Sequence, residues 1–140
     1  MLSRLSWSER AALLAVEFAK SAARFDQFGS FSAENFRLLE GAGFLSMTAP
    51  KNYGGGGANL STAVEVIGKI AEGEPSTALI LVMHMRSAVD KGALINGLRV
   101  EPELGTPMCG GLPKTIARCV DGGWRLSGRN IYATGSEGLT

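Results

Sequence analysis

The chain has 140 residues and a mass of 14.7 kDa, a length typical of one domain. Hydrophobic residues make up 45% of the sequence, and 14 basic against 13 acidic side chains give a net charge of +1. This composition is typical of a globular protein without a basic excess, so it argues against nucleic acid and against a membrane surface as partners.

The first predicted helix begins at a capping box. Ser6 and Glu9 have the Ser-x-x-Glu spacing in which each residue satisfies the backbone N–H of the other. Gly29 is expected to end this helix. Helical periodicity predicts a buried face made of Ala12, Val16, Ala19 and Ala23, widened by Leu13 and Phe25.

A second helix is expected to begin at Ser32. Phe31 before it and Phe36 within it have the spacing of a hydrophobic staple, which fixes the direction of the chain at a helix start. Gly43 is a natural left-handed residue for the end of this helix. The apolar residues expected on it are Phe36, Leu39 and Ala42.

The segment 48–58 is predicted to be a loop, because the four successive glycines Gly54 to Gly57 would cost too much entropy inside a helix or strand. Backbone N–H groups of such a run could cradle a phosphate. No Gly-Lys-Ser or Gly-Lys-Thr follows, so a flexible connector is the favoured interpretation.

Two further helices follow this loop. One is expected from about Leu60, with Asn59 as N-cap and with Val64, Ile67 and Ile70 on its buried face. Gly73-Glu74-Pro75 should end it. The next should begin near Ser76, be buried on most sides over 78–85, where it is almost entirely apolar, and fade by about Leu94.

From Leu98 onward, glycines separate short runs that suit β-strands, at 115–120, 124–126 and 131–134. Gly122-Gly123 between the first two runs predicts a two-residue hairpin turn. The expected fold class is α+β: a mainly α-helical N-terminal bundle over 1–97, followed by an incomplete β-barrel or sheet segment over 98–140.

Few side chains suggest chemistry by themselves. Cys109 and Cys119 have no metal-ligand spacing, and His84 is the single histidine, so no metal site is expected. His84 lies in an apolar helix and is expected to be a core residue. Without a signal-peptide core or a run of about 20 apolar residues, the expected location is the cytoplasm, with both thiols reduced.

Five segments, in this order, resemble passages of the acyl-CoA dehydrogenase family of flavoproteins. The first two are Leu-Leu-Glu-Gly-Ala-Gly-Phe and Ala-Pro-Lys-Asn-Tyr-Gly-Gly, and the third is the apolar helix that opens with Ser76-Thr77-Ala78. The fourth is similar to a Thr-Glu-Pro-x-x-Gly-Ser loop and the fifth to a Thr-x-Ala hairpin. They occupy residues 38–44, 49–55, 76–84, 100–106 and 115–134.

The resemblance implies an FAD-dependent oxidoreductase that dehydrogenates acyl-CoA thioesters between the α and β carbons. In the family, a carboxylate removes the α-proton and a hydride passes from the β-carbon to the flavin. No residue matches that carboxylate, so no catalytic residue is assigned. The positions that match flavin-binding residues are Val100, Gly105, Thr106, Tyr132 and Thr134. Valine at position 100 replaces a family threonine, and Asn130 replaces a lysine.

The stretch between His84 and Glu101 is shorter than in the family, and the sequence stops inside the family's β domain. We therefore expect a truncated chain that is inactive alone and that forms homo-oligomers or pairs with a homologous subunit. Two alternatives stay open: a flavin-dependent monooxygenase of the same fold, and a non-enzymatic interaction module. The acyl chain length and the electron acceptor do not follow from the sequence.

Overall fold

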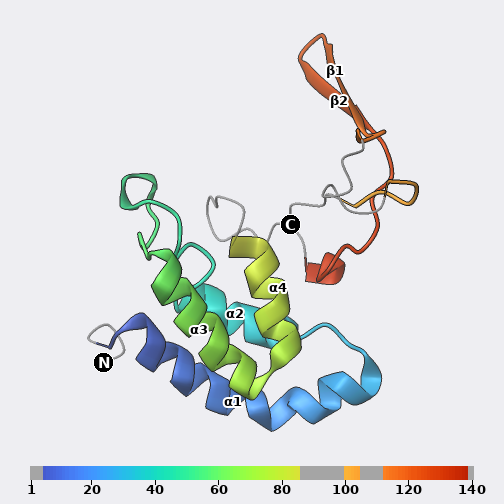
Figure 1. The fold of residues 1–140 in the computed structure, drawn as a ribbon. Coiled ribbons are helices and arrows are strands. Elements are labelled where there is room, and N and C mark those ends of the chain that lie inside the picture. The colour runs from blue at the N-terminus through green and yellow to red at the C-terminus, as the bar shows by residue number, and fades with distance from the viewer. Residues whose placement is uncertain (1–4, 86–99, 105–111, 139–140) are drawn as a thin grey trace. The chain divides into compact units, whose positions relative to one another are not determined.

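The computed structural model describes residues 5–85, 100–104 and 112–138 (Figure 1). It divides into two units, Met1–Asn96 with Gly135–Thr140 and Gly97–Thr134. Among the described residues, the first contains the helices α1 to α4 and the second an antiparallel pair of strands, so the predicted α+β fold class is confirmed. The predicted end of the fourth helix near Leu94 lies outside the described residues.

Helix α1 spans Trp7–Phe28 and has both caps that the sequence predicts. The Ser6 N–H donates to Glu9 Oε2 at 2.7 Å, and the Glu9 N–H donates to Ser6 Oγ at 3.2 Å. Gly29 ends the helix in the left-handed conformation, with φ of 57°. These two signals are local in sequence, which is why they locate the helix ends.

The predicted buried face of α1 is wrong by about one residue. Ala11, Ala15 and Phe18 are buried, whereas Val16 is 66% exposed. Both stripes have helical spacing, but the predicted one consists mainly of alanines. Burying one phenylalanine removes far more apolar area from water than burying an alanine, so the helix turns Phe18 inward.

Loss of the capping box should destabilise the helical unit. We expect Ser6→Ala to lower the free energy of unfolding by about 1 kcal/mol, because the Glu9 N–H then loses its acceptor. Denaturant unfolding followed by far-ultraviolet circular dichroism measures this. Ser8→Ala, in the same helical turn but not at the N-cap, is the matched control, and an equal effect of both substitutions would contradict the assignment.

Helix α2 spans Ala33–Gly41. The predicted staple is present, since the Phe31 and Phe36 rings stack with centroids 5.2 Å apart. Gly43 has φ of 79°, and the N–H groups of Gly43 and Phe44 donate to the carbonyls of Glu40 and Leu39. The Ser32 side chain, however, makes no capping bond; its hydroxyl faces Thr77 instead.

The glycine run Gly54 to Gly57 is not a flexible connector. Each of its four N–H groups donates to a backbone carbonyl within 46–51, at 2.9–3.2 Å. A Cβ on Gly55 would lie 2.1 Å from the carbonyl oxygen of Ala49, so only glycine fits there. The same bonds occupy the N–H groups that a phosphate would need. Within this segment, Lys51–Tyr53 form the 3-10 helix η2.

Helix α3 spans Leu60–Gly73, and its predicted N-cap is confirmed because Asn59 Oδ1 accepts from the Thr62 N–H at 2.9 Å. Its buried residues are Ala63, Val66 and Ile70. The prediction that Val64 is buried is wrong, since that side chain is 63% exposed. Val64 belongs to a second apolar face of the same helix.

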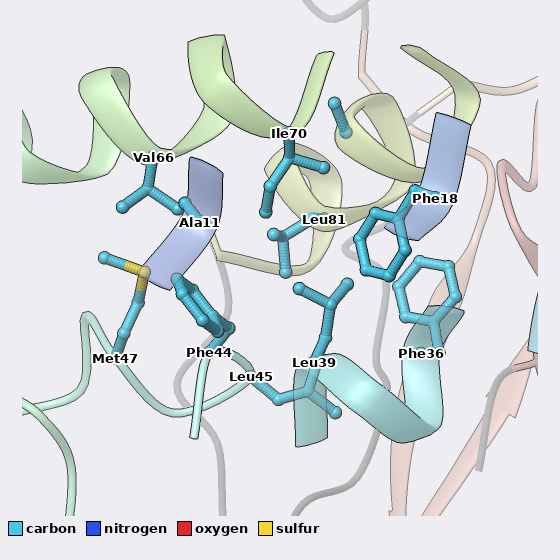
Figure 2. Packing of buried hydrophobic residues seen from close by; sticks show 11 residues of the cluster. Ala11, Phe18, Phe36, Leu39, Phe44, Leu45, Met47, Val66, Ile70 and Leu81 are labelled. Atoms are coloured by element: carbon cyan, nitrogen blue, oxygen red, sulfur yellow. The ribbon is translucent and has the colours of Figure 1, made fainter. Parts of the chain in front are cut away.

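Helix α4 spans Pro75–Met85 and completes the core. Figure 2 shows side chains of α1, α2, α3, α4 and the segment after α2 meeting in one cluster. The cluster contains Ala11, Phe18, Phe36, Leu39, Phe44, Leu45, Met47, Val66, Ile70, Ala78 and Leu81. Leu79 is an exception to the prediction that α4 is buried on most sides, because it is exposed.

The second unit contains a hairpin of β1, Ile116–Val120, and β2, Gly123–Ser127. The last pair is Val120 with Gly123, so the turn consists of Asp121 and Gly122, one residue earlier than predicted. The third predicted strand, 131–134, does not form; the described residues 128–133 have no regular secondary structure. Residues of both strands are exposed.

Candidate functional site

Three of the five predicted flavin-binding residues lie together in the second unit. The Val100 carbonyl accepts a hydrogen bond from the Ile131 N–H at 2.8 Å, which brings Val100 beside the segment that contains Tyr132 and Thr134. The hydrocarbon side chain of Val100 donates no hydrogen bond, so only its backbone is available for polar contacts. Gly105 and Thr106 lie outside the described residues.

Tyr132 has an unusual backbone conformation. Its φ is 58°, the one positive value at a non-glycine residue in the described part of the chain. Bulky residues adopt this left-handed region rarely, and it costs them about 1–2 kcal/mol. The Tyr132 side chain is 76% exposed, so packing of its ring does not compensate for the strain. Such conformations occur often at functional sites.

Thr134 lies two residues further along and is half-buried. Its N–H donates to the Tyr132 carbonyl at 2.9 Å, which closes a tight turn over Ala133. Tyr132 and Thr134 were expected on one face of a strand. Because a turn and not a strand forms here, the expected strand face is absent. Contact of Tyr132 and Thr134 with a flavin stays a prediction.

Glu101 is a buried residue next to Val100 that no sequence motif marked as functional. It is 3% exposed, and its two carboxylate oxygens accept from the backbone N–H groups of Lys114 at 2.6 Å and Thr115 at 2.8 Å. The acidic residue beside Pro102 was visible in the sequence. Its partners lie 13 and 14 residues away, and no local pattern identifies them.

The first unit contains a buried polar cluster centred on the Thr77 hydroxyl. This hydroxyl donates to Glu74 Oε2, receives a bond from Asn35 Nδ2 at 3.0 Å, and lies 2.8 Å from Ser32 Oγ. Because a hydroxyl has one proton, and Thr77 gives it to the carboxylate, Ser32 must donate to Thr77. Glu74 also accepts from the N–H groups of Ser76 and Thr77, at the start of α4.

His84 is buried, as expected for a core residue. Its Nε2 lies 2.8 Å from the Leu45 carbonyl oxygen, which can only accept, so the ring donates through Nε2. The imidazole thereby ties α4 to the chain after α2.

The described residues of the first unit line a mainly aliphatic cleft and a cleft of mixed polarity. One of about 440 Å³ is almost entirely aliphatic and lies between α3 and Val82 of α4, lined by Thr48, Ala58, Leu60, Ala63, Val64, Ile67 and Val82. The other, of about 310 Å³, mixes polar and apolar groups near the start of α4, and Asp26, Glu74 and Glu137 are among its lining residues. The first has the size and apolar character of a small-molecule site.

The described residues contain neither a metal-binding cluster nor a membrane-spanning helix. Across 5–85, 100–104 and 112–138, no group of three or more His, Cys, Asp or Glu side chains is arranged to hold a metal ion. Within the same ranges, no helix combines the length and the apolar character needed to cross a bilayer.

Comparison with known proteins identifies relatives of this chain. YdbM from Bacillus subtilis (strain 168), provisionally named an acyl-CoA dehydrogenase, is 31% identical over 153 residues, which cover 95% of this chain and 40% of YdbM. Dibenzothiophene monooxygenase from Rhodococcus erythropolis is 32% identical over 75 residues, which cover 54% of this chain and 18% of that enzyme. This chain therefore spans about two-fifths of YdbM.

Among solved structures, methanesulfinate monooxygenase MsuC from Pseudomonas fluorescens has the same fold over 90% of this chain and 35% of its own, with a TM-score of 0.64 and 24% identity. The N-terminal domain of acyl-CoA dehydrogenases matches residues 7–96, which include the four helices of the first unit. Because this match covers more than half of the chain, the chain belongs to the acyl-CoA dehydrogenase family.

Proposed function

We propose that this chain contributes the helical domain and the first hairpin of an FAD-dependent oxidoreductase that dehydrogenates acyl-CoA thioesters between the α and β carbons. The observation that carries the proposal is the match of the acyl-CoA dehydrogenase N-terminal domain to residues 7–96. No described residue is assigned as the catalytic base, and the chain alone is expected to be inactive.

The residues proposed to hold the flavin are Val100, Gly105, Thr106, Tyr132 and Thr134. The exposed ring of Tyr132 offers an aromatic face to a planar ligand, and the Thr134 side chain offers a hydroxyl. A bound flavin would supply a hydride acceptor, which amino-acid side chains lack. The part of this chain in that chemistry is to bind and orient the ring.

The aliphatic cleft of the first unit supports a thioester with a hydrocarbon chain. Its lining residues offer mostly methyl and methylene groups, and burying a ligand CH₂ group against such a surface stabilises binding by about 0.8 kcal/mol. Fatty-acid metabolism is the corresponding class of pathway.

Titration of the purified chain with FAD tests the cofactor assignment. We expect saturable binding, seen as a change in flavin fluorescence, and loss of that binding in the Tyr132→Ala, Thr134→Ala double variant. Tyr53→Ala is the matched control, because Tyr53 is 77% exposed, much like Tyr132, and lies in the other unit.

Three outcomes are informative. Binding lost in the double variant and kept in the control supports the proposal. Equal binding by all three proteins would place the flavin elsewhere on the chain. No binding by a protein whose helices are intact in circular dichroism would contradict flavin binding by this chain and leave the interaction-module alternative.

A flavin-dependent monooxygenase is the second candidate, favoured by the similarity to dibenzothiophene monooxygenase and to the fold of MsuC. Calorimetric titration with octanoyl-CoA and, separately, with dibenzothiophene distinguishes the two. Saturable binding of the thioester alone supports the dehydrogenase, and binding of the heteroaromatic compound alone supports the monooxygenase.

The proposal includes assembly with further copies of the chain or with a homologous subunit. Trp124 and Leu126 on β2 are 70% and 72% exposed and lie on one face of the hairpin with Cys119 and Ala117. Sedimentation velocity measures the association, and a monomer at every concentration would contradict self-assembly.

A further inference from the structure

Three backbone segments of the second unit meet around Glu101. The Glu101 carboxylate accepts from the N–H groups of Lys114 and Thr115, immediately before β1. The preceding residue, Val100, accepts through its carbonyl from the N–H of Ile131. Residues 100–101 therefore connect the start of β1 to the segment that contains Tyr132 and Thr134.

Within the described positions of this unit, 100–104 and 112–134, Glu101 is the one residue that is buried. A carboxylate suits the place, because its two oxygens accept from the N–H groups of two consecutive residues, and hydrogen bonds to a charged acceptor are about twice as strong as neutral ones. A glutamine of the same size could offer only one acceptor oxygen and would turn its NH₂ toward the second N–H.

The strained conformation of Tyr132 must be held in place by the neighbouring backbone. A residue stays in the left-handed region only where its surroundings hold it there. The exposed ring contributes little packing, so hydrogen bonds of the backbone must hold this conformation. On one side of Tyr132 the Ile131 N–H is bound to Val100, and on the other the Thr134 N–H is bound to the Tyr132 carbonyl.

We propose that Glu101 is a positioning residue for the flavin-binding segment 131–134, acting through the backbone of Val100 and Ile131 and without touching the flavin. The inference rests on the proposed flavin binding by this chain. It adds the residue that sets the conformation of Tyr132 before the ligand arrives.

The test compares FAD affinities of the full chain and of three variants. We expect Glu101→Gln to weaken FAD binding by about tenfold, which corresponds to the loss of about one charge-assisted hydrogen bond. Glu101→Asp should restore part of the affinity, because it keeps the charge. Glu103→Gln is the control, since the Glu103 pair with Lys114 Nζ at 3.1 Å is exposed and such pairs contribute little.

The pH dependence of binding separates positioning from mere loss of structure. The pKa of the Glu101 carboxyl lies below its usual 4.5. The largest cause is the Thr115 side chain, and the N–H groups of Lys114 and Thr115 contribute next. The positive charge of Lys114 lowers the pKa further. The ionised carboxylate therefore accepts both hydrogen bonds fully above pH 4.5, and their stabilisation is lost as the pH falls through the lowered pKa. Wild-type affinity should fall over that acid range, and Glu101→Gln should lack this step.

Amide hydrogen exchange gives a readout that does not depend on flavin. In Glu101→Gln we expect faster exchange at Thr115 and Ile131, with unchanged exchange in α1. FAD affinity or Ile131 exchange equal to wild type would overturn the inference. If the wild-type chain does not bind FAD, the proposed function fails instead, and exchange at Ile131 still decides whether Glu101 anchors this segment.

Discussion

Thr77→Val should lower the free energy of unfolding of the helical unit by about 3 kcal/mol. The two side chains have nearly the same shape, so the change removes the hydroxyl and leaves little cavity. That hydroxyl bonds Glu74, Ser32 and Asn35, and all four residues are buried. Each polar group left without a partner costs about 1–3 kcal/mol, and a charged one costs more.

Thr77→Ser is the matched variant, because it keeps the hydroxyl and removes only a methyl group. We expect it to cost about 1 kcal/mol, the value of one buried methyl group and the small cavity left behind. Denaturant unfolding of the full chain, followed by circular dichroism at the helical band, measures both. If Thr77→Val and Thr77→Ser destabilise the protein equally, the hydroxyl has no part in stability and the hydrogen-bond assignment is wrong.

The position of the Thr77 cluster explains why it matters beyond stability. It joins Ser32 and Asn35, at the start of α2, to the start of α4, so it sets how these two helices approach each other. Val82, on the same helix as Thr77, lines the aliphatic cleft. A helix start fixed by three buried hydrogen bonds therefore holds one wall of the proposed acyl site.

The sequence predicts helix ends well, because caps depend on neighbours three or four residues away. The Ser6 capping box, the Asn59 N-cap and left-handed Gly43 were all predictable for this reason. The buried faces of α1 and α3 were less predictable. Both helices carry more than one apolar stripe, and the choice between stripes depends on which large side chains meet in the core.

The candidate site was predictable only in part. Tyr132 and Thr134 were predicted to bind a flavin through the family resemblance, and the structure brings their segment to Val100. The turn at 132–134, the strain at Tyr132 and the anchor at Glu101 were not predicted. These features depend on hydrogen bonds between residues distant in sequence, and a three-strand pattern of apolar runs contains no information about them.

Gly73→Ala should destabilise the helical unit, although the same substitution at Gly68 in the same helix should stabilise it. A Cβ on Gly73 would lie 2.1 Å from the carbonyl oxygen of Ala15 in α1, so α3 and α1 would have to separate. Overpacking of this kind costs about 1–3 kcal/mol. A Cβ on Gly68 meets nothing within 4 Å, and alanine is favoured over glycine inside a helix by about 1 kcal/mol.

The opposite signs make the pair a direct test of the α1–α3 crossing. Intrinsic helix preference contributes in the same direction at both positions, so it cannot produce a difference in sign. Denaturation midpoints of Gly73→Ala and Gly68→Ala on either side of wild type would support a backbone contact between Gly73 and Ala15. Stabilisation by both substitutions would mean that the helices are not in contact there, and that Gly73 serves only to end α3 before Glu74 and the cluster around Thr77.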